Sequence, residues 1–379
     1  MELLNFGPKK LGFGCMRLPM SEGTVGGEGV VDTRQVCAMV DAFLEQGFCY
    51  FDTAHGYIAQ KSEPTVRQCL VERHPRDRFL LTDKLSGTFF QTEEEIRPFF
   101  ESQLEITGAG YFDFYLMHAL NANQYQKFTE CNAFQVAQQL RNEGKIRHVG
   151  ISFHDTPEVL EQILSEHPEI EVVQIQFNYA DLEDPKVQSL AVYEVCRRYG
   201  KPVIVMEPVK GGALANLPEA AGQILDRLQG GSRASYAIRF AASFEGVAMV
   251  LSGMSSLEQM QDNLSYMSSF QPLTQPEQEA VRRAGAVLKN QEAIACTACR
   301  YCEAGCPMRI PIPDLFAGFN GKKQGSGSTF DYEAAVSDGH GRASSCIGCL
   351  QCETVCPQHL PVSALLAQVA GEFEAAHEA

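Results

Sequence analysis

Short apolar runs alternate with longer amphipathic stretches along roughly the first 280 residues, a pattern that is typical of βα units. Between the runs, apolar positions recur at helical spacing. One such stretch, 33–47, places Val36, Val40 and Phe43 on one helix face, and Gly47 supplies its end. The runs themselves are rich in β-branched and aromatic residues, which favour strands. They lie at residues 11–15, 48–54, 79–85, 112–118, 148–153, 172–178, 202–208 and 248–254.

Eight repeats of strand and helix predict an α/β fold of the (β/α)8 type, the TIM barrel. The alternative is a doubly wound open sheet. It is less favoured, because no G-x-G-x-x-G sequence follows the first apolar run. The segment NFGPKK (5–10), which precedes that run, is a candidate for a short hairpin that closes the barrel floor.

Composition and charge narrow the class of protein. The formal net charge of −16 repels phosphate backbones, so nucleic acid is not an expected partner. No apolar run of about eighteen residues is present and the first residues lack a signal-peptide core, so we expect a cytoplasmic protein with no membrane span. Fourteen cysteines in such a chain indicate metal ligands or free thiols rather than disulfides.

Two cysteine runs with the spacing C-x2-C-x2-C-x3-C-P lie in the C-terminal quarter of the chain. In such runs the first three thiolates bind one [4Fe–4S] cluster, and the fourth ligates the other cluster. Zinc sites use four ligands in two pairs, which leaves the third cysteine and the proline without a role. We therefore predict two clusters, one held by Cys296, Cys299, Cys302 and Cys356 and the other by Cys346, Cys349, Cys352 and Cys306.

The remaining cysteines lie on apolar strand or helix patterns and are predicted to be buried free thiols. Cys15, at the end of the first apolar run, is the one that could face an active site. The others are Cys37, Cys49, Cys69, Cys131 and Cys196.

The alternation of apolar runs and amphipathic stretches ends at about Glu277. A helix-like stretch (277–292) leads into the first cysteine run, and a final amphipathic helix follows the second. The long interval between the runs resembles α-helical ferredoxin domains, with helices expected at 312–319 and 332–336 and a flexible loop at 321–328. We predict a barrel over 1–276 and a small α-helical ferredoxin-like domain over 277–379.

Polar side chains stand at the predicted carboxyl ends of most strands, where TIM barrels carry their chemistry. Singly, such residues have ordinary structural roles, because a strand-end Asp is often a helix cap and a lone His a satisfied core group. Together they predict an active site at one rim, with Tyr57 one loop beyond the first of them. These strand-end residues are Asp52, Lys84, His118, Ser152, Asn178, Glu207 and Ser252.

Seven motifs are spread over the first 270 residues. They are FDTAHGYIAQKSE (51–63), LLTDKL (80–85), FYLMHAL (114–120), KIRHVGIS (145–152), QIQFN (174–178), VMEPVKGG (205–212) and LSGMSSLEQMQDN (251–263). Through these motifs, residues 1–270 resemble the aldo-keto reductases. The resemblance implies that the family's catalytic tetrad falls on Asp52, Tyr57, Lys84 and His118.

The tetrad roles have a physical basis. A carbonyl that accepts hydride needs a proton at its oxygen, and a tyrosine with a pKa near ~10 is a poor acid–base group at neutral pH unless a cation lies beside it. Lys84 would supply that cation, and Asp52 would hold Lys84 in place. His118 would orient the carbonyl or share the proton. The alternative is a barrel that has kept its tetrad and lost its activity.

The resemblance also implies an extended nicotinamide dinucleotide. Ser152 and Gln174 would hold the carboxamide, with Phe153 where the family commonly has Asn. Met206 stands where many members stack a tyrosine on the nicotinamide. Further contacts, along the pyrophosphate and the adenosine, are implied for Glu207, Lys210, Gly211, Gly212, Ser252, Gly253, Met254, Ser256, Gln259 and Asn263.

Two of these positions bear on the choice of nucleotide. Many family members bring Lys and Arg to the 2′-phosphate of NADP(H), whereas this chain has Gly253 and Gln259 at those places. A phosphate would lose two charge-assisted contacts there. The resemblance therefore implies NADP(H), and the departures leave NAD(H) open.

The combination of barrel and cysteine runs resembles a group of bacterial and archaeal aldo-keto reductases with a C-terminal dicluster ferredoxin domain. Three hypotheses follow. In the first, the barrel reduces a small-molecule carbonyl, or oxidises the alcohol, with NAD(P)H, and the clusters are structural or sense redox state. In the second, the clusters carry electrons between a redox protein and the barrel, through a bound flavin. In the third, the protein only transfers electrons and the barrel is inactive.

Overall fold

Eight parallel strands close into a barrel, as predicted. The computed structural model describes residues 4–27, 29–289, 293–323, 330–337 and 339–374. The first strand pairs with the last and with the second strand of the barrel, which completes the circle. The strands are β1 (Leu11–Gly14), β4 (Tyr50–Asp52), β5 (Leu80–Leu85), β6 (Phe112–Leu120), β7 (Ile146–Phe153), β8 (Val172–Gln176), β9 (Val203–Met206) and β10 (Val247–Ser252).

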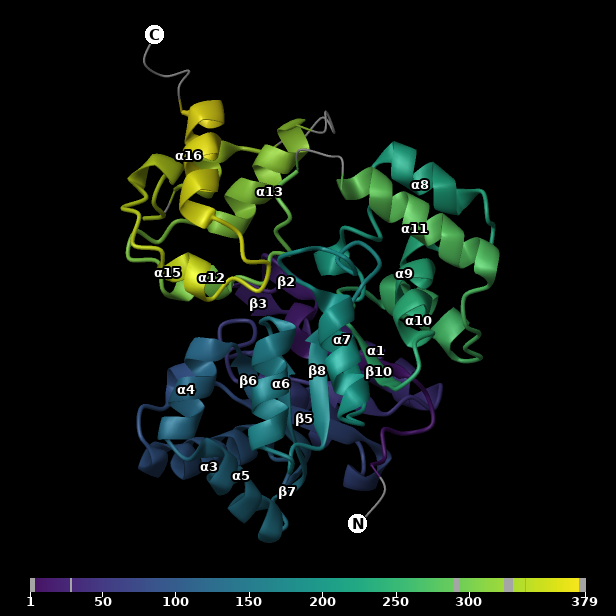
Figure 1. Cartoon of the computed structure of the whole chain (residues 1–379), viewed down its shortest axis with the longest axis vertical. Coiled ribbons are helices and arrows are strands. Elements are labelled where there is room, and N and C mark those ends of the chain that lie inside the picture. The colour runs from purple at the N-terminus through teal and green to yellow at the C-terminus, as the bar shows by residue number, and fades with distance from the viewer. Residues whose placement is uncertain (1–3, 28, 290–292, 324–329, 338, 375–379) are drawn as a thin grey trace.

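Helices surround the strands and cover their outer face (Figure 1). The predicted helix at 33–47 is α1, which begins at Thr33 with Asp32 as its N-cap and buries Val36, Val40 and Phe43. The helices of the barrel are α1 (Thr33–Glu45), α2 (Ser62–Val66), α3 (Glu93–Thr107), α4 (Ala122–Glu130), α5 (Ala133–Asn142), α6 (Pro157–Glu166), α7 (Ser189–Arg198), α8 (Glu219–Asp226), α9 (Arg233–Ala242) and α10 (Leu257–Met267).

The hairpin expected at 5–10 is wrong, because residues 8–10 form bends and no strand is assigned there. Pro8 has no N–H to donate to a strand partner. The segment still closes the barrel floor, since the Phe6 ring stacks 5.1 Å from that of Phe114. A hairpin occurs later, where β2 (Met20–Gly23) and β3 (Gly29–Val31) pair antiparallel.

The long helix α11 (Gln275–Lys289) packs against α8 and α9 of the barrel. Arg239 of α9 donates to Glu277 at 2.9 Å across this contact. The sequence boundary at 276 therefore falls inside α11, just after its first residues, and it stays a prediction.

The C-terminal helices form a second, smaller core beside the barrel mouth (Figure 1). Helices predicted at 312–319 and 332–336 are present, and α13 extends into the loop expected at 321–328, of which 324–328 lie outside the described residues. Among the described helices, none is long and apolar enough to cross a membrane. The elements are α12 (Tyr301–Ala304), α13 (Ile312–Lys323), α14 (Tyr332–Ala335), α15 (Gln351–Thr354) and α16 (Val362–Phe373).

Candidate active site

The structure brings the four tetrad residues together at the carboxyl ends of three neighbouring strands. Asp52 is the last residue of β4, Lys84 lies near the end of β5 and His118 near the end of β6. Tyr57 follows in the loop after β4. All four side chains are buried, and Lys84 has no exposed surface.

Lys84 links Asp52 to Tyr57. Its ammonium donates to Asp52 Oδ1 at 2.6 Å, to the Thr53 carbonyl at 2.8 Å and to the Tyr57 hydroxyl at 3.1 Å. These contacts use all three N–H groups of the ammonium. Burial and the Asp52 carboxylate together raise the pKa of Tyr57 well above its usual value. Tyr57 is therefore a protonated phenol at neutral pH, with a cation ready to stabilise the phenolate if the proton leaves.

His118 is held by a residue that the sequence did not single out. Ser86, two positions beyond Lys84, lies with its Oγ 2.5 Å from His118 Nδ1. Burial, Lys84 and His154 lower the pKa of His118 well below 6.5, so the imidazole is neutral. A Ser86 hydroxyl that donates to Nδ1 leaves the imidazole proton on Nε2, on the side of the barrel mouth.

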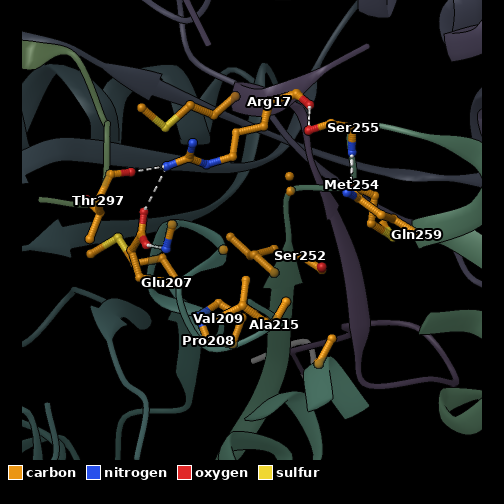
Figure 2. A pocket seen from close by; sticks show the side chains of 18 of the residues that line it. Arg17, Glu207, Pro208, Val209, Ala215, Ser252, Met254, Ser255, Gln259 and Thr297 are labelled. Atoms are coloured by element: carbon orange, nitrogen blue, oxygen red, sulfur yellow. Dashed lines mark hydrogen bonds and ion pairs between the residues drawn. The ribbon is translucent and has the colours of Figure 1, made fainter. Parts of the chain in front are cut away.

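A cavity of about 740 Å³ opens beside the tetrad. Figure 2 shows part of its lining. Asp52 and Tyr57 form part of its wall. Of the residues implied to bind a nucleotide, those that line this cavity are Gln174, Met206, Glu207, Gly211, Gly212, Ser252, Gly253, Met254, Gln259 and Asn263.

Three residues that the resemblance assigned to the nucleotide do not line this cavity, and each has a partner within the protein. Ser152 Oγ accepts from the Ala119 N–H at 2.7 Å. Lys210 donates to Asp181 and to Gln358. Ser256 is the N-cap of α10 and accepts from the Gln259 N–H. Gln174 does line the cavity, but its amide also donates to Asp52 Oδ2 at 3.0 Å.

Hydrogen bonds fix the loops around the cavity (Figure 2). Glu207 accepts from the Gly211 N–H at 2.6 Å, and its other oxygen is 3.8 Å from Arg17. Across the mouth, Ser255 donates through its hydroxyl to the Arg17 carbonyl and through its N–H to Gln259. The loop after β9 and the loop after β10 are thus both tied down, which suits a binding site for an extended ligand.

Charged lining residues were also missed by the sequence reasoning. Arg17 follows β1 by three residues, so its position after a strand end was the available signal. Glu258 and Asp262 lie on the first turns of α10 and line the cavity at the end expected to hold adenosine. Arg233 lines it as well, but its guanidinium is paired with Asp226.

The C-terminal domain contributes part of the cavity wall, which the sequence did not predict. Thr297, Cys299 and Tyr301 line the cavity together with the barrel residues. Arg17 donates to the Thr297 carbonyl at 2.5 Å, and the Tyr301 hydroxyl lies 3.4 Å from His118 Nε2. The first cysteine run therefore borders the barrel site.

Cysteines of the two runs lie close enough to affect one another's pKa, and the crossed sets stay a prediction. Burial raises the pKa of Cys302, and nearby thiols raise it further, including Cys356 of the other run. The pKa of Cys352 is raised by burial and by neighbours that include Cys306. A second cavity is bordered by Cys306, Cys346, Cys349 and Cys352.

Among the described residues, no three His, Cys, Asp or Glu side chains converge closely enough to hold one ion. In a [4Fe–4S] cluster each thiolate binds a different iron, so the sulfurs lie farther apart. Of the other cysteines, Cys15, Cys69, Cys131 and Cys196 are buried, while Cys37 and Cys49 are half-buried.

Comparisons with known proteins agree with this geometry. A family model described as the aldo/keto reductase family matches residues 10–286, and a 4Fe-4S dicluster domain model matches residues 295–360. The comparison with curated proteins finds no match.

Solved structures with a similar fold include two of an aldo-keto reductase from Klebsiella pneumoniae. The complex with NADPH is 20% identical, with a TM-score of 0.58, and covers 72% of this chain and 90% of that one. The complex with NADP and acetate is 21% identical with the same coverage and TM-score. The holo form of an aldo-keto reductase from Bacillus halodurans is 24% identical, covers 73% and 91%, and has a TM-score of 0.59. At this identity the likeness shows the fold.

Proposed function

Since the chain belongs to the aldo/keto reductase family and is an oxidoreductase, we propose that it reduces the carbonyl of a small molecule with NAD(P)H, or oxidises the corresponding alcohol. Asp52, Tyr57, Lys84 and His118 are the proposed catalytic residues. The observation that carries the proposal is the Lys84 ammonium, which donates to both Asp52 and Tyr57 beside an open cavity.

The four side chains have different roles at the carbonyl oxygen of the substrate. When bound, the nicotinamide would supply hydride to the carbonyl carbon. Tyr57 donates its proton to the oxygen as negative charge develops there, and the Lys84 ammonium stabilises the phenolate that remains. Asp52 accepts from Lys84 and keeps it aimed at Tyr57. His118 donates from Nε2 and holds the oxygen in reach of Tyr57.

The cavity fits an extended dinucleotide. Met206 and Glu207 border it next to the tetrad, and Gly212, which has no side chain, lets the backbone approach a pyrophosphate closely. We propose that the stretch from Ser252 to Asn263 holds the adenosine end. Because Ser152 and Lys210 already have protein partners, we assign them a supporting role around the nucleotide rather than direct contact.

For the C-terminal domain we propose two [4Fe–4S] clusters with crossed ligation. Cys296, Cys299 and Cys302 with Cys356 would hold the first, next to the barrel. Cys346, Cys349 and Cys352 with Cys306 would hold the second, farther out. The neighbours of Cys302 and Cys352 across the two runs support this assignment.

A second candidate function is electron delivery to the barrel, and Cys299 favours it because it lines the barrel cavity. At the other cluster site Cys349 is exposed, and Ile347 and Leu350 beside it are 64% and 48% exposed. Such an apolar surface suits a redox protein as partner. Each cluster moves one electron, so a flavin in the cavity would be needed to split a hydride pair.

The experiment is Tyr57→Phe in holoprotein purified without oxygen, assayed with NAD(P)H and small aldehydes. We expect kcat to fall at least ~100-fold, because the proton donor is lost. Nucleotide binding and the visible absorbance of the clusters should not change. Tyr236→Phe is the matched control, since that hydroxyl lies on α9, outside the cavity lining, and accepts from the Gly230 N–H. Full activity of Tyr57→Phe would overturn the tetrad. Turnover driven by a reduced ferredoxin without NAD(P)H would instead support the second candidate.

A further inference from the structure

Tyr301 belongs to the first cysteine run, yet its side chain enters the barrel site. It lies between Cys299 and Cys302 and begins α12. Its ring meets that of His118 edge to face, with centroids 6.1 Å apart, and its hydroxyl lies 3.4 Å from His118 Nε2. The same hydroxyl is also a hydrogen-bond neighbour of Tyr57.

The Tyr301 hydroxyl therefore lies between the two groups that the proposed reaction needs. A carbonyl oxygen must accept one hydrogen bond from Tyr57 and one from His118 Nε2 as hydride arrives. A single position satisfies both donors, and two oxygens cannot share it. We propose that the Tyr301 hydroxyl occupies the site of the substrate's carbonyl oxygen, and that a carbonyl substrate binds by displacing it.

The surroundings of Tyr301 indicate how the displacement occurs. The backbone before it is held, because Arg17 donates to the Thr297 carbonyl and Thr297 packs on Gly211, where a Cβ would lie 2.5 Å from the Thr297 oxygen. Arg300 is paired with Asp314 at 2.5 Å. The backbone is thus held on both sides of Cys299. In the proposed displacement, the Tyr301 side chain turns aside while this backbone stays in place.

The inference rests on the proposed function, and it sets a requirement for the substrate. An oxygen that replaces a phenol hydroxyl must accept from both Tyr57 and His118, which a carbonyl or carboxylate oxygen does with its two lone pairs. Carboxylates that cannot be reduced should then act as inhibitors at the same place. Tyr301 then affects the affinity for the substrate, although none of its covalent bonds is made or broken in the reaction.

The test uses Tyr301→Phe in the holoprotein, with acetate as a non-reactive probe and 4-nitrobenzaldehyde as a reactive one. The ring stays but its hydroxyl bonds are lost, so acetate no longer has to break them. We expect the Kd for acetate, measured by calorimetry with oxidised nucleotide bound, to fall about five- to tenfold. The KM for the aldehyde should fall by a similar factor with kcat within about twofold. Tyr301→Leu should change both in the same direction.

Tyr332→Phe is the matched control, because its hydroxyl bonds to Glu374 and the Ala343 N–H inside the same small domain. It should leave the acetate Kd within about twofold. An unchanged or higher acetate Kd in Tyr301→Phe would overturn the inference. So would a drop of kcat by tenfold or more, which would make Tyr301 a proton donor. If Tyr57→Phe stays active, the proposed function fails instead.

Discussion

The first cysteine run, residues 296–307, and the second, 346–357, fold alike but have different surroundings. Arg300 and Leu350, at equivalent positions, both adopt left-handed backbone, with φ of 63° and 62°, and each precedes a helix of one turn. Yet Tyr301 contacts His118 in the barrel, while the equivalent Gln351 belongs to the outer run, where Leu350 is 48% exposed. The spacing of the cysteines determines the backbone, and the residues between them determine what each run contacts.

The difference assigns separate tasks to the two runs. The intervening residues of the first, such as Thr297 and Tyr301, bind the barrel and line its cavity. In the second, Ile347 takes the place of Thr297 and is 64% exposed. If both clusters are present, the inner one borders the active site and the outer one faces solvent. The following predictions test this difference between the two runs.

The largest contrast is expected between Cys299→Ala and Cys349→Ala. Each variant should lose about half of the visible absorbance, because each removes a ligand of one cluster. Of these two cysteines only Cys299 lines the cavity proposed to hold the nucleotide, so Cys299→Ala should raise the KM for NAD(P)H about tenfold and Cys349→Ala by less than about twofold. Steady-state kinetics and absorbance spectra measure both effects. Equal changes in KM would show that the two runs do not differ in this way. Unchanged turnover in Cys349→Ala would exclude a relay through the outer cluster.

A smaller effect is expected at the outer surface. Replacing Ile347 and Leu350 together by Glu should slow reduction of the clusters by a reduced ferredoxin about tenfold, because the apolar contact is lost. Stopped-flow absorbance measures this rate. The matched control is Val30→Glu, which puts a charge on another exposed apolar residue, on β3. A rate that falls equally in the control would assign the effect to charge alone.

The pH profile of the barrel reaction should be nearly flat between pH 6.5 and 10. Carbonyl reduction needs neutral His118 and protonated Tyr57. Burial, with Lys84, lowers the pKa of His118 well below 6.5, and burial, with Asp52, raises that of Tyr57 well above 10.0. Activity is therefore lost only as pH falls through the first pKa or rises through the second. We expect kcat to vary less than about twofold across this window. A half-maximal point between pH 7 and 9 would contradict these environments.

The smallest effect concerns the end of the cavity that is proposed to hold adenosine. Glu258 and Asp262 place negative charge there, which disfavours a 2′-phosphate. Glu258→Gln should raise kcat/KM for NADPH about two- to threefold and leave that for NADH unchanged, since the carboxylate is exposed and screened. Glu130→Gln on α4 is the control. If NADPH is already preferred tenfold in the unmodified protein, another group neutralises the phosphate.

Much of this organisation follows from the sequence alone. The eight apolar runs predicted the barrel, because strands buried on both faces need continuous apolar residues. Strand ends pointed to Asp52, Lys84 and His118, and the cysteine spacing to crossed sets. These features depend on local periodicity or on a motif.

Contacts between distant segments were missed for a physical reason. Ser86 was overlooked because its partner, His118, is set by the register of neighbouring strands. Tyr301 was overlooked because the docking of one domain on another depends on the fit of two surfaces, which no periodicity records. The predicted hairpin at 5–10 was wrong because a polar segment with Pro8 can pack an aromatic ring, Phe6, without forming a ladder. Lys210 was assigned to a ligand, although Asp181 offered a partner within the protein.

The most direct measurement follows the hydrogen that reaches the carbonyl carbon. Holoprotein prepared without oxygen is given 4-nitrobenzaldehyde and NAD(P)H deuterated at both C4 positions, and the alcohol is analysed by mass spectrometry. Direct hydride transfer beside the Tyr57–Lys84–Asp52 array predicts one deuterium at the carbinol carbon. Product that carries solvent hydrogen at that carbon would contradict it, and would assign the reaction to electrons delivered through the clusters or a flavin.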